Sequence, residues 1–448
     1  MTPSLSRPLF LFFALALAVA SSGCGLFSKN HLRGPEFTLH SDRSPEFLAR
    51  VAEKTARIYR GFEELFELSP DRLGRTAIVL EGEETDIIDQ RYAPDILGYY
   101  IPLLNYISID TAPCSQDDAM LEQVLLHEVA HHFIVTEWPP ASGECWLNEG
   151  LAGALEVTVF EGARFEHPLV NPVLYQLARE EAFARNGKVS LGDLIEMSWS
   201  RFHRREDKER NYALAWSAVY FLLERHLPRG QPLGKRIEAL YGMNRDAIAR
   251  LEPEWIAFVR GFDVTGHLVA MSRNVASEYS LSAIWATKQL GTLRVMDDLR
   301  ILEGLVSLFD DPDPLKRVHA YISFLRKLEG TSHSFFLDQE SVRHGVDRIG
   351  TVLEDPSEPP PLREAVAVAL GASFRTSDRW IQPLVTLLDG GHGELRAAAA
   401  QSLSRIAKKP TIVNPAFWRE APAGERAREV AEWRTWLAIQ GREGPAAR

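Results

Sequence analysis

Residues 125–133 read LLHEVAHHF and set two histidines four positions apart within an apolar run. Residues four apart lie on the same face of a helix, so His127 and His131 are expected to point the same way. Glu128 follows the first histidine directly and lies beside that face, not on it. Two imidazoles arranged like this can bind one metal ion, with the carboxylate close enough to act on a bound water.

A second acidic motif follows this helix and could complete the metal site. The stretch ECWLNEGLAGALE begins at Glu144 and carries Glu149, which follows His131 by eighteen positions. A catalytic zinc site needs three protein ligands and an open position for water, so Glu149 is the expected third ligand. Glu144 and Glu156 are the alternatives. Structural zinc sites are usually closed and rich in cysteine, so this set favours a catalytic site.

HEVAH followed by WLNEGLA is similar to the gluzincin metallopeptidases, and much of 37–265 resembles the bacterial peptidase MA-like domains. The resemblance implies an α+β zincin-like metallopeptidase domain. It implies that His127, His131 and Glu149 bind Zn²⁺ and that Glu128 activates the water. No Gly-rich motif with an upstream glutamate is present to hold a substrate amino terminus, so the resemblance does not extend to exopeptidase action.

The same families place a tyrosine or histidine where it stabilises the oxyanion of the tetrahedral intermediate. By order in the chain the resemblance implies Tyr212 for this role, with His203 as the reserve and simple packing of Tyr212 as the alternative. His132 lies off the metal-binding face and is expected to pack. Gly98, Tyr99 and Tyr100 are expected either to line the cleft or to form plain hairpin structure.

The rest of the N-terminal half is expected to mix strands with helices. Residues 75–82 predict a strand, and 99–110 predict an edge strand because Pro and Asn interrupt the run. An amphipathic helix is indicated by residues at helical spacing: Leu48, Val51, Ala52, Thr55, Ile58 and Tyr59. Further helices are expected at 115–138, from about 148, and at 189–197, 211–227 and 252–262.

The N-terminus has the features of an export signal. A short positive segment is followed by the apolar run PLFLFFALALAVA, which fits a signal peptide over 1–24. The sequence SSGCG resembles the bacterial lipobox, which implies lipidation of Cys24 and a lipid anchor in the membrane. Ser21 departs from that pattern, and A-V-A at 18–20 offers ordinary cleavage instead. A linker at 25–36 and a place in the bacterial cell envelope are expected.

The other two cysteines, Cys114 and Cys145, flank the metal-binding helix. In an oxidising compartment they are expected to form one disulfide, with two free thiols as the alternative. The formal net charge of −11 over 448 residues argues against nucleic acid as a partner, since phosphate binding needs a basic surface.

From about 296 to 440 the pattern changes to paired helices. Three stretches each join an apolar helix, an acidic turn rich in Pro or Gly, and a second helix opened by Leu315, Leu362 or Leu395. They resemble HEAT repeats, which implies an all-α HEAT-like domain able to bind a protein partner. An irregular helical bundle is the alternative. Residues 266–295 are expected to form a helical connector.

Together these features predict an exported zinc metallopeptidase that hydrolyses peptide bonds in a protein or peptide substrate. Two other functions remain open. The first is a non-catalytic, zinc-containing scaffold that acts through its helical repeats. The second is a zinc hydrolase that acts on a non-peptide amide.

Overall fold

The structure is a computed structural model of the whole chain. It describes residues 30–439 apart from 69, 82–96, 113–117, 140–143, 162–163, 184–189, 274–280, 294–297, 331–338, 372–376, 391, 408–411 and 413. The predicted signal peptide, the lipidation site Cys24 and Cys114 lie outside the described residues. The chain forms two compact units, which meet in sequence between Phe262 and Asp263.

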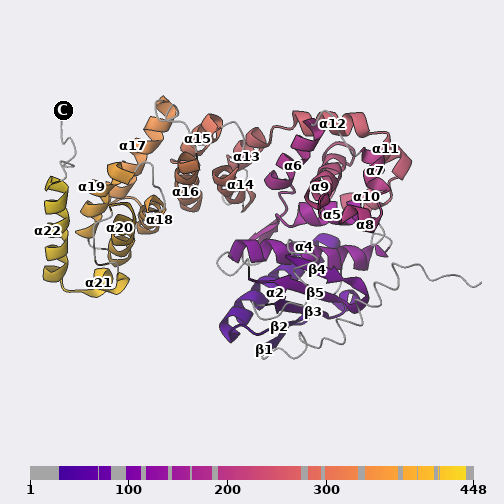
Figure 1. Cartoon of the computed structure of the whole chain (residues 1–448), viewed down its shortest axis with the longest axis horizontal. Coiled ribbons are helices and arrows are strands. Elements are labelled where there is room, and N and C mark those ends of the chain that lie inside the picture. The colour runs from indigo at the N-terminus through magenta and orange to yellow at the C-terminus, as the bar shows by residue number, and fades with distance from the viewer. Residues whose placement is uncertain are drawn as a thin grey trace, which may run out of the picture. The chain divides into compact units, whose positions relative to one another are not determined.

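A five-stranded mixed sheet forms the base of the first unit (Figure 1). Its order is β1-β2-β3-β5-β4, in which β2, β3 and β5 are parallel and the two outer strands are antiparallel to their neighbours. The strands are β1 (Asn30–Arg33), β2 (Phe37–Ser41), β3 (Thr76–Glu81), β4 (Gly98–Ile101) and β5 (Tyr106–Asp110). The predicted linker at 25–36 is therefore wrong for Asn30–Arg33, because these residues form β1 and pair with β2.

The prediction of one strand over 99–110 is also wrong, because this segment folds into two antiparallel strands. Pro102 begins a short 3-10 helix, η1 (Pro102–Leu104), and Asn105 follows with a left-handed φ of 46°. These two residues reverse the chain, so that β4 pairs with β5 and becomes the edge of the sheet. The expected edge strand is therefore present, but it is only four residues long.

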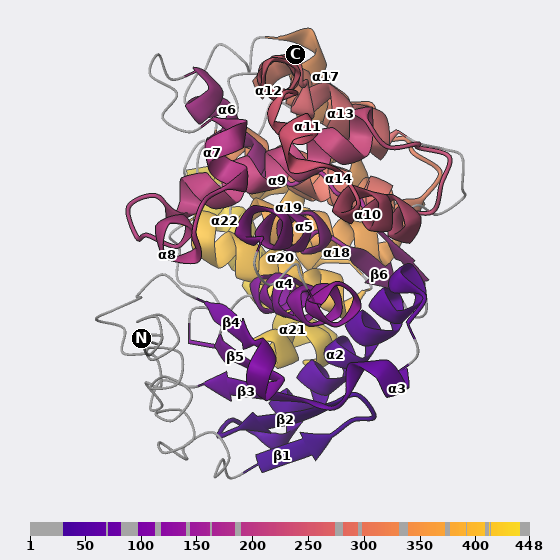
Figure 2. The same cartoon turned by 90° about the vertical axis from the view of Figure 1, so that its right-hand side faces the viewer.

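Two long helices, α2 (Pro45–Phe66) and α4 (Asp118–Glu137), pack against each other and against the sheet (Figure 2). The residues predicted to form the buried face of α2 are all buried, which confirms that helix. Phe133 of α4 packs its ring against Tyr59, Phe62 and Phe66 of α2. This aromatic contact fixes α4 over the sheet.

The remaining helices of the first unit form a layer beyond α4. They are α5 (Cys145–Leu155), α6 (Pro172–Phe183), α7 (Leu191–Ile195), α8 (Trp199–Phe202), α9 (Lys208–Arg225), α10 (Leu233–Tyr241), α11 (Arg245–Ala249) and α12 (Glu252–Gly261). The short helix α3 (Pro70–Leu73) and the hairpin of β6 (Val159–Glu161) and β7 (Arg164–Glu166) complete the unit. Helix α5 lies between α4 and α9 and packs against both.

The described part of the second unit is entirely helical. Four successive helix pairs are α13 (Val264–Ser272) with α14 (Leu281–Thr292), α15 (Asp298–Val306) with α16 (Pro314–Gly330), α17 (Glu340–Glu354) with α18 (Pro360–Leu370), and α19 (Ser377–Leu388) with α20 (Gly393–Ile406). Helices α21 (Pro415–Glu420) and α22 (Ala423–Ile439) follow. The predicted connector at 266–295 is itself the first pair, because α14 packs closely against α16.

Three arginines occupy the same position in successive pairs. Arg317, Arg363 and Arg396 are each the fourth residue of the second helix, in α16, α18 and α20. Each donates to a backbone carbonyl in the turn or at the helix end that precedes it: Asp311 O at 3.2 Å, Leu353 O at 2.7 Å and Gly390 O at 2.7 Å. The recurring contact shows that the three pairs are built alike. An α+β part followed by a helical part is thus confirmed, while the zincin and HEAT assignments stay predictions.

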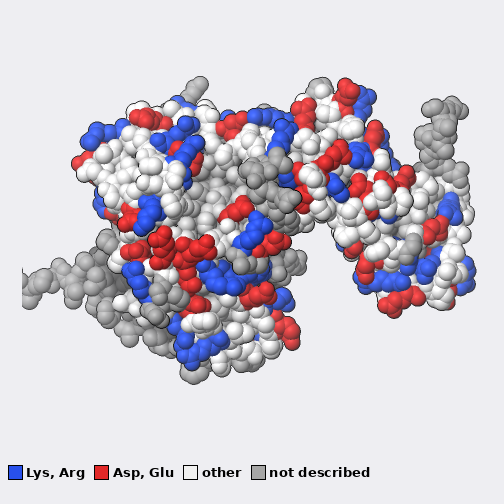
Figure 3. Space-filling view, turned by 180° about the vertical axis from the view of Figure 1, so that it is seen from behind, with Lys and Arg blue, Asp and Glu red and all other residues white. Residues whose placement is uncertain are grey.

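Among the described residues no helix is both long enough and apolar enough to span a bilayer. Figure 3 shows one face of the molecule, on which the described Lys and Arg side chains are interspersed with Asp and Glu.

The contacts at the boundary predict that the first unit folds alone. Tyr175 and Tyr220 pack against the ring of Phe262, whereas Asp263 caps α13 and pairs with Arg300 in the second unit. A fragment ending at Phe262 should therefore unfold cooperatively. Calorimetry should show the same transition in this fragment as in the full chain. A fragment ending at Gly330 contains α16 but lacks α18, against which α16 packs. This fragment should not show the unfolding transition of the second unit. Loss of cooperative unfolding in the Phe262 fragment would contradict the boundary.

Candidate metal centre

The predicted ligands come together where α4 and α5 cross. His127 and His131 project from α4, and Glu149 projects from α5. Their ligand atoms lie within 4.8 Å of one another, and the three residues form a group that could hold a metal ion. Nε2 of each histidine is 3.3 Å from the same carboxylate oxygen, Glu149 Oε2. Ligands about 2.0–2.2 Å from a shared tetrahedral centre lie roughly 3.3–3.6 Å apart, so these spacings suit a metal ion.

Hydrogen bonds at the far side of each ring leave both Nε2 atoms free to bind a cation. Nδ1 of His127 lies 2.6 Å from Glu156 Oε2, and Nδ1 of His131 lies 3.0 Å from Asn148 Oδ1. Both partners are acceptors, so each Nδ1 donates to its partner, and each Nε2, which faces Glu149 Oε2, is the nitrogen that can release its proton to bind a cation. Metal-binding histidines are commonly oriented in this way by a carboxylate or carbonyl oxygen. Glu156 therefore orients His127 in this structure and is not part of the ligand group.

The centre concentrates negative charge in a buried place. Glu128 and Glu149 are 5% and 8% exposed. Burial by itself favours the neutral acid, but His131 and the other neighbouring histidines hold the pKa of Glu149 well below its usual range. Burial lowers the pKa of His127, but Glu149 and Glu156 outweigh it and hold that pKa well above the usual value. Buried charges of this kind are normally paired or bound to a metal ion.

Glu128 lies beside the ligand group with one oxygen unused. Its Oε2 is buried and has no hydrogen-bond partner among the described residues. Burial raises the pKa of Glu128, and the two histidines only partly offset this effect. The backbone of β4 lies against this carboxylate, because a Cβ at Gly98 would come within 2.9 Å of Glu128 Cγ and 3.0 Å of Oε1. Glycine at position 98 therefore makes room for Glu128.

Tyr212 and His203 both reach the centre. The ring of Tyr212 stacks on His127 with centroids 6.2 Å apart. Burial and the nearby Glu149 hold the pKa of the Tyr212 phenol well above its usual value, so it stays a proton donor. His203 follows α8 and places Nε2 3.1 Å from Glu149 Oε1. The structure therefore brings the expected residue and the reserve residue into one site.

A cleft of about 690 Å³ opens beside these residues. His127, Glu128, His203 and Tyr212 line it, together with Gly98 at the sheet edge. Ligand sites commonly have volumes of roughly 300–1,000 Å³. The cleft is therefore large enough to admit a substrate to the metal-binding group.

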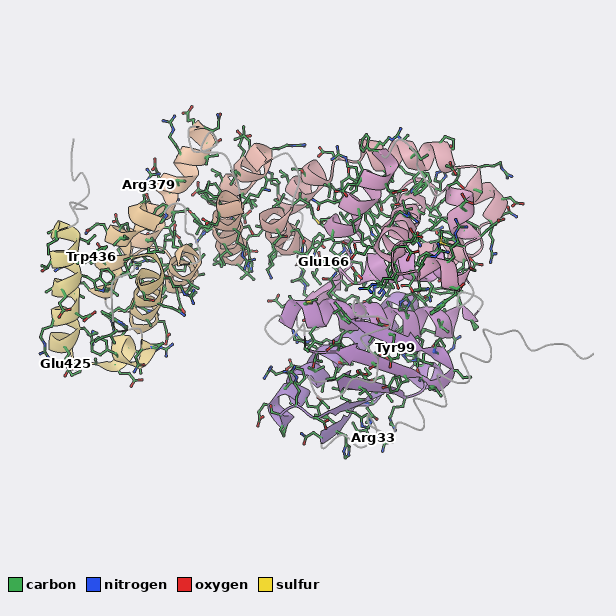
Figure 4. All side chains as sticks on the ribbon, in the orientation of Figure 1. Arg33, Tyr99, Glu166, Arg379, Glu425 and Trp436 are labelled. Atoms are coloured by element: carbon green, nitrogen blue, oxygen red, sulfur yellow. The ribbon has the colours of Figure 1, made fainter. Side chains whose placement is uncertain are left out.

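Two tyrosines of the edge strand have other roles than lining the cleft. Tyr99, labelled in Figure 4, packs with Tyr106 on one face of the sheet. Tyr100 lies on the other face and donates to Asn105. Gly98 lines the cleft as expected, whereas neither Tyr99 nor Tyr100 is among its lining residues, so the alternative of plain hairpin structure holds for the two tyrosines. His132 is buried and packs, as predicted, with Nδ1 3.0 Å from Tyr59 Oη.

Cys145, at the first position of α5, is a free and buried thiol. Burial raises its pKa to about 11, which keeps it protonated near neutral pH. The structure therefore does not contain the predicted disulfide, and Cys114 lies outside the described residues. Cys145 is 6% exposed and packs at the start of α5. Its burial is reason enough for a cysteine at this position without a disulfide.

Comparison with known proteins finds no relative for this chain: no family model, no curated protein and no solved structure matches it. The similarity of HEVAH and WLNEGLA to the gluzincins therefore stays a prediction.

The roles of several residues in the site cannot be recognised from the sequence alone. Asn148 stands inside the WLNEGLA motif, yet only the structure shows its bond to His131. Lys208 lies with its ammonium group 5.6 Å from the Tyr212 ring centroid and lines the cleft. Gly98 is expected at the cleft, but its contact with Glu128 depends on the packing of β4 against α4, which no local pattern predicts.

Gly150 follows the third ligand and permits α5 to approach α9. A Cβ at this position would lie 2.5 Å from Ala215 O and 2.6 Å from Val219 Cγ2. Contacts this short do not occur between real atoms of this kind, so only glycine fits. The close approach places Glu149 on α5 next to Tyr212 on α9.

Replacing Gly150 by Ala should therefore destabilise the protein. Overpacking of this kind typically costs about 1–3 kcal/mol, and the separation of α5 from α9 should also weaken metal binding. Urea unfolding measures the first effect. Gly261→Ala is the matched control, because nothing lies within 4 Å of a Cβ at that position. Equal stability of Gly150→Ala and Gly261→Ala would show that the helices are not held this closely.

The ligand geometry predicts a graded loss of metal binding. Glu149→Ala removes the oxygen shared by both histidines and should abolish stoichiometric binding. Glu156→Gln keeps the shape but loses the carboxylate that orients His127, and should weaken affinity about 10–100-fold. Competition with a metal-binding dye measures both variants. Glu53→Gln, whose side chain is 74% exposed on α2, is the control and should bind as the parent does. Unchanged affinity in Glu149→Ala would exclude this residue as a ligand.

Proposed function

We propose that the first unit is a zinc-dependent peptidase that hydrolyses peptide bonds, with Glu128 as the general base. The observation that carries this proposal is the position of Glu128. Its carboxylate is buried, lines the same cleft as His127 and has an oxygen without a partner in the described structure. A site that only stored a metal ion would have no use for a buried, unpaired carboxylate beside its ligands.

Zinc is the metal that suits this set of side chains best. Two histidines and one glutamate are a common ligand set for catalytic zinc, and the cleft lined by His127 would give a water molecule or a substrate access to a bound ion. When bound, zinc supplies Lewis acidity to the scissile carbonyl and to the attacking water. The resemblance of His127, Glu128, His131 and Glu149 to the gluzincin motif supports the same assignment.

The residues around the cleft have different roles in the proposed hydrolysis. Glu128 accepts a proton from the attacking water and delivers it to the nitrogen of the leaving amine. Because burial raises its pKa, the carboxylate holds this proton more readily than an exposed glutamate would. Tyr212 keeps its phenolic proton and can donate it in a hydrogen bond to the oxyanion, a contribution worth several kcal/mol in comparable sites. His203 is a second candidate donor on the same side.

The edge strand β4 supports a polypeptide as the substrate. Its outer edge has no neighbouring strand in the described sheet, and Gly98 lies at the mouth of the cleft beside Glu128. An extended peptide can add to such an edge through backbone hydrogen bonds, which position a peptide bond without reading its side chains. A small non-peptide amide would not use this edge.

The proposal predicts that Glu128→Gln binds zinc but cleaves slowly. General-base assistance typically contributes about 10²–10⁴ in rate, so turnover of an unstructured protein should fall at least a hundred-fold. Metal analysis should find one zinc per chain in both proteins. Mass spectrometry of the products measures the rate and the cleaved bonds, with Glu53→Gln as the control.

Three outcomes would contradict the proposal. Equal cleavage by the parent and Glu128→Gln would remove Glu128 as the base. Absence of cleavage by the zinc-loaded parent would favour a scaffold. Release of ammonia or an amine from small amides, without cut peptides, would favour a hydrolase acting on non-peptide amides.

A further inference from the structure

Much of the lining of the cleft is apolar. Its apolar lining residues are Leu97, directly before β4, Met120 and Val124 of α4, and Val173, Leu174 and Leu177 of α6. The remaining part is polar, with His203, Arg205, Lys208 and Tyr212 among its lining residues. The cleft thus joins an apolar region to a charged one, and His127 and Glu128 line the same cavity.

Helix α6 turns one face toward the cleft. Val173, Gln176, Leu177 and Glu180 are spaced by three, four and seven positions, which places them on the same side of the helix. Val173 is 63% exposed although it is a large aliphatic residue. A single exposed aliphatic residue is ordinary, but three aliphatic residues of α6 line the same cleft as Leu97, Met120 and Val124. The arrangement leaves an apolar space that a side chain can fill.

The apolar region lies close to the reacting atoms. Met120, Val124 and His127 follow helical spacing along α4, which rises about 1.5 Å per residue, so Val124 and Met120 are about 4.5 Å and 10 Å along the axis from His127. An extended peptide advances about 3.3 Å per residue. The apolar region therefore corresponds to the first three residues on one side of the scissile bond.

Asn171 connects the start of α6 to the metal centre through hydrogen bonds. This buried residue accepts from Leu174 N at 3.2 Å and so caps α6. Its Nδ2 donates to Glu156 Oε1 at 2.6 Å, and the other oxygen of Glu156 accepts from His127 Nδ1. The helix that forms the apolar wall and the histidine that binds the metal are therefore linked through a single carboxylate. The wall is a fixed part of the site.

We infer that α6 is the specificity helix of this enzyme, and that Val173 and Leu177 select polypeptide substrates with a bulky aliphatic or aromatic side chain within three residues of the cleaved bond. The inference rests on the proposed peptidase function. It commits to the substrate as the occupant, because the apolar wall is continuous with the cleft that holds Glu128 and His127.

The test measures binding and cleavage separately. A set of fluorescent ten-residue peptides carries Leu, Phe, Ala, Ser, Lys or Glu at one position at a time, and its binding to the full-length Glu128→Gln protein loaded with zinc is followed by anisotropy. Leu or Phe at one position should bind at least about ten-fold more tightly than Ala, since filling an apolar pocket has an effect of this size. Cleavage of the same peptides by the parent should show the same preference.

Val173→Lys in the Glu128→Gln protein should remove this preference and improve binding of the Glu peptides. The side chain of Val173 is largely exposed, so the substitution should leave folding and zinc content unchanged. Val368→Lys in the second unit is the matched control, because Val368 is also an exposed helical valine, at 42%. Unselective binding by the parent form, or the same preference in Val173→Lys and Val368→Lys, would overturn the inference. Selective binding without any cleavage would overturn the peptidase proposal and leave α6 as a helix that selects bound polypeptides.

Discussion

The first unit is organised around one buried carboxylate. Glu149 is contacted by His127 and His131 through one oxygen and by His203 through the other. A carboxylate in such a place is costly unless positive charge surrounds it, so the helices that supply the histidines are bound to the position of α5. The close approach of α5 to α9 at Gly150 contributes to the same arrangement, because it fixes α5, and with it Glu149, next to α9. A bound cation would take the place of the protons on His127 and His131 as the positive charge that offsets this carboxylate.

The ligands could be predicted from sequence because helical spacing is a local property. His127 and His131 share a face of α4 whatever surrounds the helix, and the buried face of α2 follows from the same rule. The hairpin at 98–110 was misread because Pro102 and Asn105 suit both an edge strand and a turn. Strand β1 was missed because four residues of alternating exposure carry too weak a pattern.

The residues that orient the ligands could not be predicted, because their roles depend on contacts between distant segments. Glu156 ends α5 but contacts His127 on α4, and Asn171 reaches the same carboxylate from the start of α6. A glutamate and an asparagine at such places are ordinary in any sequence. Only packing of α4, α5 and α6 gives them a function, and that packing is set by buried apolar residues spread along the chain.

The parallel arrangement of β2, β3 and β5 has a kinetic consequence. Each parallel pair joins segments separated by a whole crossover, so a long loop must close before the strands can pair. The helix pairs of the second unit, by contrast, form from neighbours in sequence and should assemble quickly. Helix α4 packs against β4 and β5, and α5 follows it along the chain. During synthesis the histidines would therefore be exposed before Glu149 is positioned, and the finished metal centre would be among the last features of the first unit to form.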